Sequence, residues 1–226
     1  METSIVCNTN AAALVVDDDP LLRASLGRLL RSVGLDVQLF ASVDEFLKFD
    51  RPDRPSCLVL DVRLPGRSGL DFQRDLAAAN IGLPIVFITG YGDIPMTVQA
   101  MKHGAIEFLT KPFREQDLLD AIHTGLARDR GRLEDERVVR NLRECFERLS
   151  PREREIMIEI AHGRVNKQIA RDIGVTETTV KVHRCNMMRK MNAASLLDLR
   201  DMAEKLKLLR RTLQSAGARY DRQPGF

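Results

Sequence analysis

Residues 57–70 read CLVLDVRLPGRSGL, in which a short apolar run leads directly into the carboxylate of Asp61. The four residues before Asp61 favour a buried strand, whereas Pro65, Gly66 and Gly69 predict a turn after it. A solvated strand end is the simplest interpretation of a lone acid in this place. A functional role for Asp61 therefore depends on which residues the rest of the chain brings beside it.

Short apolar runs alternate with amphipathic stretches throughout the first half of the chain. The runs predict strands at residues 13–16, 35–40, 57–60, 84–89 and 106–110. The helices predicted between them are residues 20–33, a short helix that opens with a capping box at residues 42–45, residues 70–79, residues 93–102, and a last helix from about Arg114. This alternation predicts an α/β fold, with a doubly wound, five-stranded parallel sheet covered on both faces, in a domain at residues 12–125.

The second half lacks strand-like runs and predicts a small all-α domain of four helices at residues 148–212. Its first helix opens with a capping box at residues 150–153, with proline at the first helical position, and ends at Gly163. The second closes at Gly174, the third has Thr176 as its expected N-cap, and the fourth runs through residues 194–209. The tight turn between the second and third helices predicts a helix-turn-helix.

The segment that joins the two halves, residues 126–147, is charged and is predicted to be a helical linker. Apolar residues recur at helical spacing near its end, at Val138, Leu142, Cys145, Phe146 and Leu149. Two interpretations stay open: a solvated linker helix, and a stripe that packs in a dimer or between the domains. The tail at residues 213–226, which has glycine, proline and polar residues, is expected to be disordered.

Composition and charge are those of an ordinary soluble globular protein. The 226 residues carry a net charge of only +3, although arginine and lysine are dense after residue 126. No apolar run approaches the roughly 20 residues that cross a bilayer, and the N-terminus lacks the basic region of a signal peptide. Because the four cysteines (Cys7, Cys57, Cys145 and Cys185) are scattered, we expect reduced thiols in a cytoplasmic protein without a membrane partner.

Reactive side chains follow four of the predicted strands, at the edge where ligands bind in an open parallel sheet. These residues are Asp17, Asp18 and Asp19 after the first strand, Asp61 after the third, Thr89 at the end of the fourth, and Lys111 after the fifth. Because clustered carboxylates repel each other, we predict a hard cation among them, Mg²⁺, with Mn²⁺ able to replace it.

This set of side chains suits phosphoryl transfer. Asp61 can act as the nucleophile and form an acyl phosphate, while Thr89 hydrogen-bonds a phosphoryl oxygen and Lys111 supplies positive charge. A phosphatase of the haloacid dehalogenase class would need a second aspartate two residues after the nucleophile, where this chain has Arg63. We therefore predict that the protein is not an enzyme beyond metal-dependent self-phosphorylation and autodephosphorylation at Asp61.

Residues 13–125 resemble a response-regulator receiver domain through three motifs: VVDDDP, LVLDVRLPGRSG and FITGYGDIPMTVQAMKHGAIEFLTKPF. The resemblance implies that Asp61 takes a phosphoryl group from a sensor histidine kinase. It also implies that Asp17, Asp18 and the backbone carbonyl of Arg63 join Asp61 in binding the metal.

The same resemblance makes Thr89 and Lys111 the remaining signature positions of the receiver. Phe108 stands at the position of the aromatic switch residue, which is tyrosine in many members of the family. When Asp61 is phosphorylated, Thr89 is expected to move towards the phosphoryl group and Phe108 to turn inward.

Residues 149–207 resemble the DNA-binding domain of LuxR/NarL-type regulators, most closely the FixJ-like subgroup, through the stretch LSPREREIMIEIAHGRVNKQIARDIGVTETTVKVHRCNMMRKM. The resemblance implies a supporting helix at residues 166–173. It implies a recognition helix from residue 176 or 177 to residue 191, which lies in the major groove of DNA.

Helical spacing independently separates two faces of the expected recognition helix. Val180, Met187 and Met191 share one face and are expected to pack on the domain core, while the opposite face is polar. The candidate DNA-contacting residues are Asn166, Lys167, Thr176, Thr178, Thr179, Lys181, Val182, His183, Arg184, Cys185 and Arg189. The cations suit phosphate and guanine contacts and Val182 suits a thymine methyl, whereas His183 could either contact phosphate or pack.

Together the two halves predict a two-component transcriptional regulator, an activator by expectation, that is controlled by phosphorylation. Phosphorylation of Asp61 is expected to promote homodimerisation through the helix at residues 93–102 and the fifth strand, and thereby binding to a double-stranded DNA operator. The expected partners are a sensor histidine kinase, operator DNA and RNA polymerase. The alternative is a phosphate-independent transcription factor whose receiver is only an interaction module.

Overall fold

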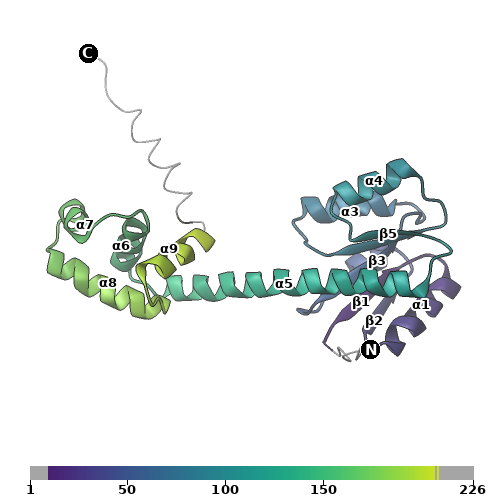
Figure 1. Ribbon diagram of the computed structural model, residues 1–226, viewed down its shortest axis with the longest axis horizontal. Coiled ribbons are helices and arrows are strands. Elements are labelled where there is room, and N and C mark those ends of the chain that lie inside the picture. The colour runs from purple at the N-terminus through teal and green to yellow at the C-terminus, as the bar shows by residue number, and fades with distance from the viewer. Residues whose placement is uncertain (1–9, 207, 209–226) are drawn as a thin grey trace, which may run out of the picture. The chain divides into compact units, whose positions relative to one another are not determined.

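The computed structural model describes residues 10–206 and 208, which fall into two compact units. The first unit ends at Glu134 and the second begins at Asp135. Figure 1 draws the strands of the first unit in purple to teal and the short helices of the second in green to yellow. The predicted disordered tail, the predicted end of the second domain at residue 212, and Cys7 lie outside the described residues.

Among the described residues, the first unit contains a five-stranded parallel sheet with the order β2-β1-β3-β4-β5. The strands are β1 (Ala12–Val16), β2 (Asp36–Phe40), β3 (Ser56–Asp61), β4 (Ile85–Thr89) and β5 (Glu107–Thr110). The central strands β1, β3 and β4 are buried along their whole length because helices cover both faces of the sheet. The predicted doubly wound sheet is therefore confirmed.

Helices cover the two faces of the sheet and give each face its own apolar core. α1 (Pro20–Ser32) and the start of α5 (Glu115–Glu147) pack on one face. α2 (Val43–Leu47), α3 (Gly69–Ala78) and α4 (Ile94–Lys102) pack on the other. Figure 1 labels α3 and α4 on this side of the sheet. The predicted capping box of α2 is only half formed, because the Glu45 carboxylate accepts a hydrogen bond from the N–H of Ala41 and not from that of Ser42.

The helix α5 runs without a break over 33 residues, so the last helix of the receiver and the predicted linker are one continuous helix. Asp129 in this helix is buried, and its carboxylate accepts a hydrogen bond from the N–H of Ser56 at 2.8 Å. It also accepts one from Nε of Arg132 at 2.8 Å. Contacts between α5 and the first unit therefore continue beyond residue 125, where the domain boundary was predicted.

The described part of the second unit contains four short helices around one apolar core. They are α6 (Pro151–Ala161), α7 (Asn166–Ile173), α8 (Glu177–Met191) and α9 (Leu196–Lys205). The capping box between Ser150 and Glu153 forms as predicted, and Gly174 ends α7 in the left-handed conformation with φ of 69°. α7 and α8 then pack against each other, which gives the predicted helix-turn-helix.

The apolar stripe at the end of α5 packs within the second unit. Leu142, Cys145 and Phe146 are half-buried against the core of that unit, and Leu149 is buried in it. This part of the stripe is therefore not a fully solvated face, and its packing in a dimer or between the domains stays a prediction. It belongs to the core of the second unit itself.

The described helices and cysteines bear on two further predictions. Within the described ranges, none of the helices combines the length and the apolar character required to cross a membrane. Cys57, Cys145 and Cys185 are free thiols. Burial raises the pKa of the Cys57 thiol well above its ordinary value, so this residue is an unreactive part of the core.

Gly69, the first residue of α3, lies so close to the backbone of Asp61 that a side chain does not fit. A Cβ atom at residue 69 would lie 2.4 Å from the carbonyl oxygen of Asp61, which cannot move without moving the end of β3. Gly69→Ala is therefore expected to lower the free energy of unfolding by about 1–3 kcal/mol, as measured by urea denaturation. Gly90→Ala is the matched control because a Cβ there meets no atom within 4 Å, and equal losses in both variants would contradict the steric argument.

Candidate functional site

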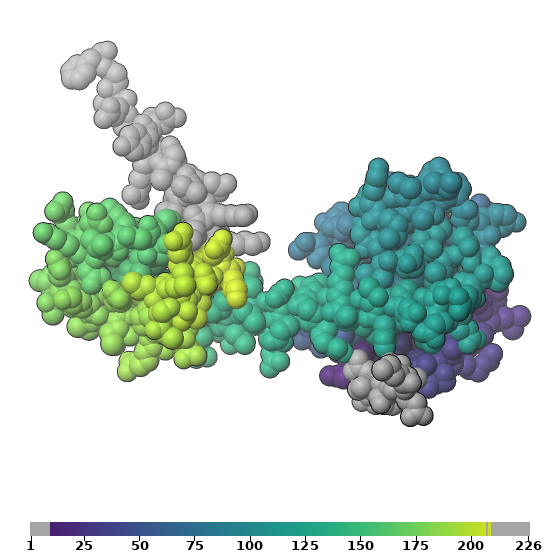
Figure 2. Space-filling view, viewed as in Figure 1, coloured from purple at the N-terminus to yellow at the C-terminus, as the bar shows by residue number. Residues whose placement is uncertain are grey.

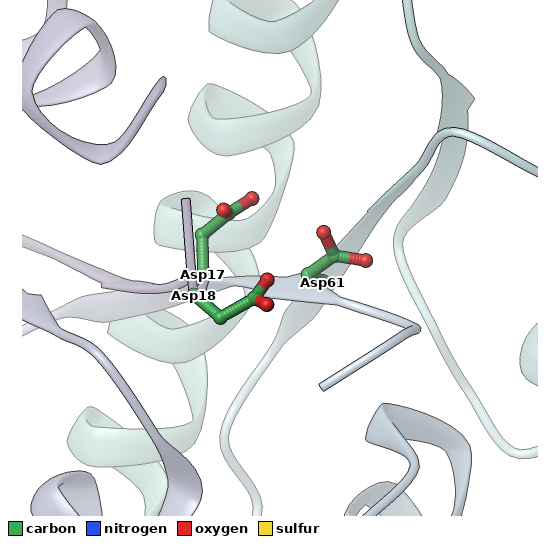
Figure 3. A group of neighbouring side chains, drawn as sticks. All are labelled: Asp17, Asp18 and Asp61. Atoms are coloured by element: carbon green, nitrogen blue, oxygen red, sulfur yellow. The ribbon is translucent and has the colours of Figure 1, made fainter. Parts of the chain in front are cut away.

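Three carboxylates meet at the carboxyl ends of β1 and β3, where the order of the strands in the sheet reverses. Asp17 and Asp18 follow β1, and Asp61 is the last residue of β3. One oxygen from each of the three side chains lies within 4.8 Å of the other two, and Figure 3 shows the carboxylates gathered at this edge. Asp17 and Asp61 are buried, whereas Asp18 is exposed. The structure thus brings together three of the four acids named from the sequence, whereas Asp19 caps α1 by accepting hydrogen bonds from the N–H groups of Leu21 and Leu22.

The ammonium group of Lys111 joins two of these acids. Its Nζ donates a hydrogen bond to Oδ2 of Asp17 at 2.8 Å and another to Oδ2 of Asp61 at 2.6 Å. Burial lowers the pKa of Lys111, but its hydrogen bonds with the two carboxylates and their charges outweigh burial and raise the pKa overall. Lys111 therefore stays positively charged and holds the buried pair of acids together.

Backbone groups fix the direction in which each buried carboxylate points. The N–H of Asp19 donates to Oδ1 of Asp17 at 2.9 Å, and the N–H of Arg63 donates to Oδ1 of Asp61 at 2.9 Å. Each buried carboxylate thus has one oxygen held by a backbone donor and the other by Lys111. This leaves Asp61 oriented before any ligand binds.

The donor set fits a divalent metal ion such as Mg²⁺. Three carboxylate oxygens lie close together, and Lys111 is their only cationic hydrogen-bond partner among the contacts of the described residues. Burial raises the pKa of Asp17, and the nearby charge of Asp61 adds to this effect. Mg²⁺ favours a few carboxylates together with water, which is what two buried acids and one exposed acid offer. The contact observed for Arg63 is made by its N–H, so the role predicted for its carbonyl oxygen stays a prediction.

Thr89 lies at the end of β4 and is buried. Its hydroxyl donates to the carbonyl oxygen of Tyr91 and accepts from the N–H of Tyr91, both at 3.2 Å. Tyr91 in turn stacks under the guanidinium of Arg63, whose Cζ lies 4.6 Å from the ring centroid. The loops after β3 and β4 are therefore linked next to Asp61 by one stacked pair.

Phe108 is buried in β5, with its ring centroid 6.1 Å from that of Phe87. The predicted inward turn of this ring on phosphorylation starts from an exposed ring, whereas the observed side chain is only 9% exposed. The backbone of Gly92 packs close to the ring, since a Cβ added there would lie 2.9 Å from Cε1 of Phe108. Phe108 is thus buried in this structure, and its turn on phosphorylation of Asp61 stays a prediction.

The helix α8 separates a buried face from an exposed face as the spacing predicts. Val180, Met187 and Met191 are buried in the core of the second unit. The candidate DNA-contacting residues that are exposed on α8 are Thr178, Lys181, Val182, Cys185 and Arg189. His183 and Arg184 are half-buried at the border, so for His183 both phosphate contact and packing remain open.

The remaining candidates lie at the starts of α7 and α8. The hydroxyl of Thr176 caps α8 by accepting from the N–H of Thr179 at 3.1 Å, and the two hydroxyls lie 2.9 Å apart. Asn166 and Lys167 begin α7 and line one groove together with Arg184. Candidate DNA-contacting residues of both α7 and α8 therefore line the groove. The hydroxyls of Thr176 and Thr179, in contrast, already take part in the N-cap of α8.

Comparison with known proteins supports both halves of this description. Residues 13–123 match the family of response regulator receiver domains, and residues 147–203 match the luxR family of bacterial regulatory proteins. Nodulation protein W of Bradyrhizobium diazoefficiens is 56% identical over 199 residues, which cover 88% of each chain. The chain belongs to the response regulators that carry a LuxR-type DNA-binding domain.

Other relatives of this response regulator also match most of its length. The transcriptional regulatory protein FixJ of Azorhizobium caulinodans is 42% identical over 191 residues, which cover 84% of this chain and 90% of FixJ. The solved structure of the response regulator StyR aligns with a TM-score of 0.76 at 48% identity and covers 87% of this chain and 99% of StyR. The response regulator is accordingly a transcriptional regulator of a two-component system, whose receiver implies a histidine kinase partner and whose second domain binds DNA.

Sequence reasoning missed two contacts in this response regulator. One is the stacking of Tyr91 with Arg63. The only signal for this contact in the sequence is that each of the two residues stands two positions after a predicted site residue. The other is an ion pair of Lys190 with Glu153, whose Nζ and Oε2 atoms lie 2.7 Å apart. The capping box identified Glu153, but Lys190 resembles any charged residue near the end of a helix.

Proposed function

We propose that Asp61 accepts a phosphoryl group from a sensor histidine kinase and that phosphorylation promotes dimerisation and operator binding. The observation that carries the proposal is the preorganised carboxylate of Asp61. Its Oδ2 lies 2.6 Å from the Lys111 ammonium, its Oδ1 accepts from the N–H of Arg63, and two further acids lie beside it. A buried structural aspartate would need one cation, but not this surplus of negative charge.

The proposed reaction is a transfer between two side chains. A carboxylate oxygen of Asp61 attacks phosphorus, the bond from phosphorus to the kinase histidine breaks, and the electron pair of that bond stays on the imidazole nitrogen. Asp17, Asp18, Asp61 and the carbonyl of Arg63 are the proposed ligands of Mg²⁺, which Mn²⁺ can replace. When bound, the metal supplies positive charge that neutralises the phosphoryl oxygens.

Lys111 and Thr89 act next to the acyl phosphate in this proposal. The ammonium of Lys111 already contacts Asp61, so it can move from the carboxylate to a phosphoryl oxygen without a change of backbone. The Thr89 hydroxyl can exchange its 3.2 Å hydrogen bond to the Tyr91 carbonyl for a bond to phosphate. The loop after β4 would then lose one of the contacts that hold its resting conformation.

The proposed dimer forms through α4 and β5. Ile94, Val98 and Met101 are exposed on α4, and their spacing places them on one side of the helix. α4 lies on the surface of the first unit (Figures 1 and 2). Two joined copies would present two α8 helices to half-sites about 34 Å apart on a two-fold operator. When bound to this operator in the cytoplasm, the dimer would act on RNA polymerase, and we expect it to be an activator.

The test compares the protein with and without beryllofluoride, a stable substitute for the phosphoryl group. Dimerisation followed by sedimentation, and binding to a duplex selected from a random library by the wild-type protein, are both expected to strengthen on addition of beryllofluoride. A full switch from about 1:99 to 99:1 requires about 5.5 kcal/mol, so affinity changes of a hundredfold or more are readily detected. The phosphate-independent alternative expects the same oligomeric state and the same affinity in both samples.

A further inference from the structure

The recognition helix α8 is held by an ion pair on the side away from its candidate DNA-contacting face. The Nζ of Lys190 lies 2.7 Å from Oε2 of Glu153 on α6. Lys181 and Lys190 are nine positions apart, which is two and a half helical turns, so they project from opposite sides of α8. The half-buried Lys190 therefore contacts α6 within the unit, whereas its neighbour Arg189 is exposed.

The carboxylate that receives Lys190 is itself rigidly held. The side chain of Glu153 is only 5% exposed, and its Oε2 also accepts a hydrogen bond from the N–H of Ser150 at 2.7 Å. The N–H of Glu153 donates to Oγ of Ser150 at 3.3 Å and completes the capping box of α6. A charge-assisted hydrogen bond is shorter and stronger than one between neutral groups, and unlike an apolar contact it is directional.

The apolar contacts of α8 do not fix its position to the same degree. Two of its three buried anchors are Met187 and Met191, and methionine adapts to irregular gaps because it is unbranched and flexible. Rotation of the helix by about 20° would move a side-chain tip at about 5–6 Å from the axis by about 2 Å. Such a shift is enough to break hydrogen bonds to the edges of bases.

We propose that Glu153 and Lys190 are positioning residues for DNA recognition, which set the rotation and height of α8 on α6. The inference rests on the proposed placement of α8 in the DNA groove. It assigns to Lys190 a role that differs from the phosphate contact expected of a lysine in a recognition helix. Neither residue touches DNA in this assignment.

Because Glu153 and Lys190 carry opposite charges, an experiment can distinguish a positioning role from a simple effect of net charge on DNA binding. Removing the negative charge of Glu153 should strengthen attraction to DNA if only net charge matters. Loss of positioning instead weakens specific binding. Likewise, a phosphate contact by Lys190 would lower the salt slope of binding by about one when removed, whereas a positioning role leaves that slope unchanged.

The experiment compares the full-length variants Glu153→Gln, Lys190→Met and the double variant. Binding is measured at several salt concentrations to the selected duplex and to a random-sequence duplex of equal length, below the unfolding temperature of each variant. We expect each single variant to bind the selected duplex about tenfold more weakly than the wild type and to bind the random-sequence duplex equally well. The double variant should lose no more affinity for the selected duplex than the single variant that binds it more weakly. The salt slopes should match that of the wild type.

Matched controls keep the result decisive. Glu155→Gln removes the same charge from an exposed position on α6, and Lys205→Met removes an exposed lysine of α9. Lys190→Met leaves the capping box intact, so it tests the pair even if Glu153→Gln fails to fold. Unchanged specific affinity in folded Lys190→Met protein, or a salt slope lowered by about one, would overturn the proposal. Failure of the underlying placement of α8 is recognised separately, because Lys181→Ala would then bind like the wild type.

Discussion

Replacement of Asp61 by asparagine is expected to abolish labelling of the protein by acetyl phosphate in the presence of Mg²⁺. The amide is a poor nucleophile, and the substitution removes the atom on which the acyl phosphate would form. It also removes one of the two charges that Lys111 contacts, so the effect falls on the reaction centre itself. We expect complete loss, measured by intact-protein mass spectrometry, together with loss of the response to a phosphoryl donor in DNA binding.

Asp71→Asn is the control for this prediction. Asp71 is an exposed aspartate on α3 that pairs with Arg74, so its replacement makes the same chemical change without touching the carboxylate cluster. This control should be labelled like the wild type. Retention of wild-type labelling in the Asp61→Asn variant would place the phosphoryl group on another residue and remove the basis of the proposed switch.

The convergence of the acids was predictable because the parallel direction of the strands follows from simple rules. Runs such as residues 13–16 and 57–60 are too apolar for a surface, and alternation with helices makes the sheet parallel. In a parallel sheet all carboxyl ends lie at one edge, so Asp17, Asp61 and Lys111 had to meet there. Each strand therefore lies within one residue of its predicted bounds.

What the sequence could not predict depends on side-chain geometry between distant residues. Lys111 contacts Asp17 and Asp61 at once, and they precede it by 94 and 50 residues. The packing of Phe108 beside Phe87 in the apolar core likewise joins residues far apart in the sequence, which periodicity does not describe. Local sequence patterns determine the helices, the strands and the edge of the sheet at which a side chain lies. The group that each polar side chain contacts is determined only by packing between residues far apart in the sequence.

The continuous helix α5 shows a limit of a different kind. Residues 126–147 were expected to form a separate linker because their charge differs from that of the receiver helices. Charge does not end a helix, and the only glycine in that segment, Gly131, lies inside a helix that continues for several more turns. The predicted change in composition therefore marks a change of environment along one helix, from the buried Asp129 to exposed residues and then to the half-buried Phe146.

Lys181→Ala is expected to weaken binding to the selected duplex about tenfold and to lower the salt slope of binding by about one. Lys181 is exposed and lies about 100° around α8 from the buried Val180, where a cation contributes nothing to the core. Because the loss is mainly electrostatic, the variant should fold with the same free energy of unfolding as the wild type. Fluorescence anisotropy at several salt concentrations measures both the affinity and the slope.

Lys205→Ala provides the comparison that gives this result its meaning. Lys205 is an exposed lysine in the same unit, so its replacement changes the net charge equally but lies on α9. If both variants lose affinity to the same extent, only the overall charge of the unit matters and α8 has no privileged role. If only Lys181→Ala weakens binding, the exposed face of α8 lies against the phosphates, because counterion release depends on the charges that contact DNA and not on those elsewhere.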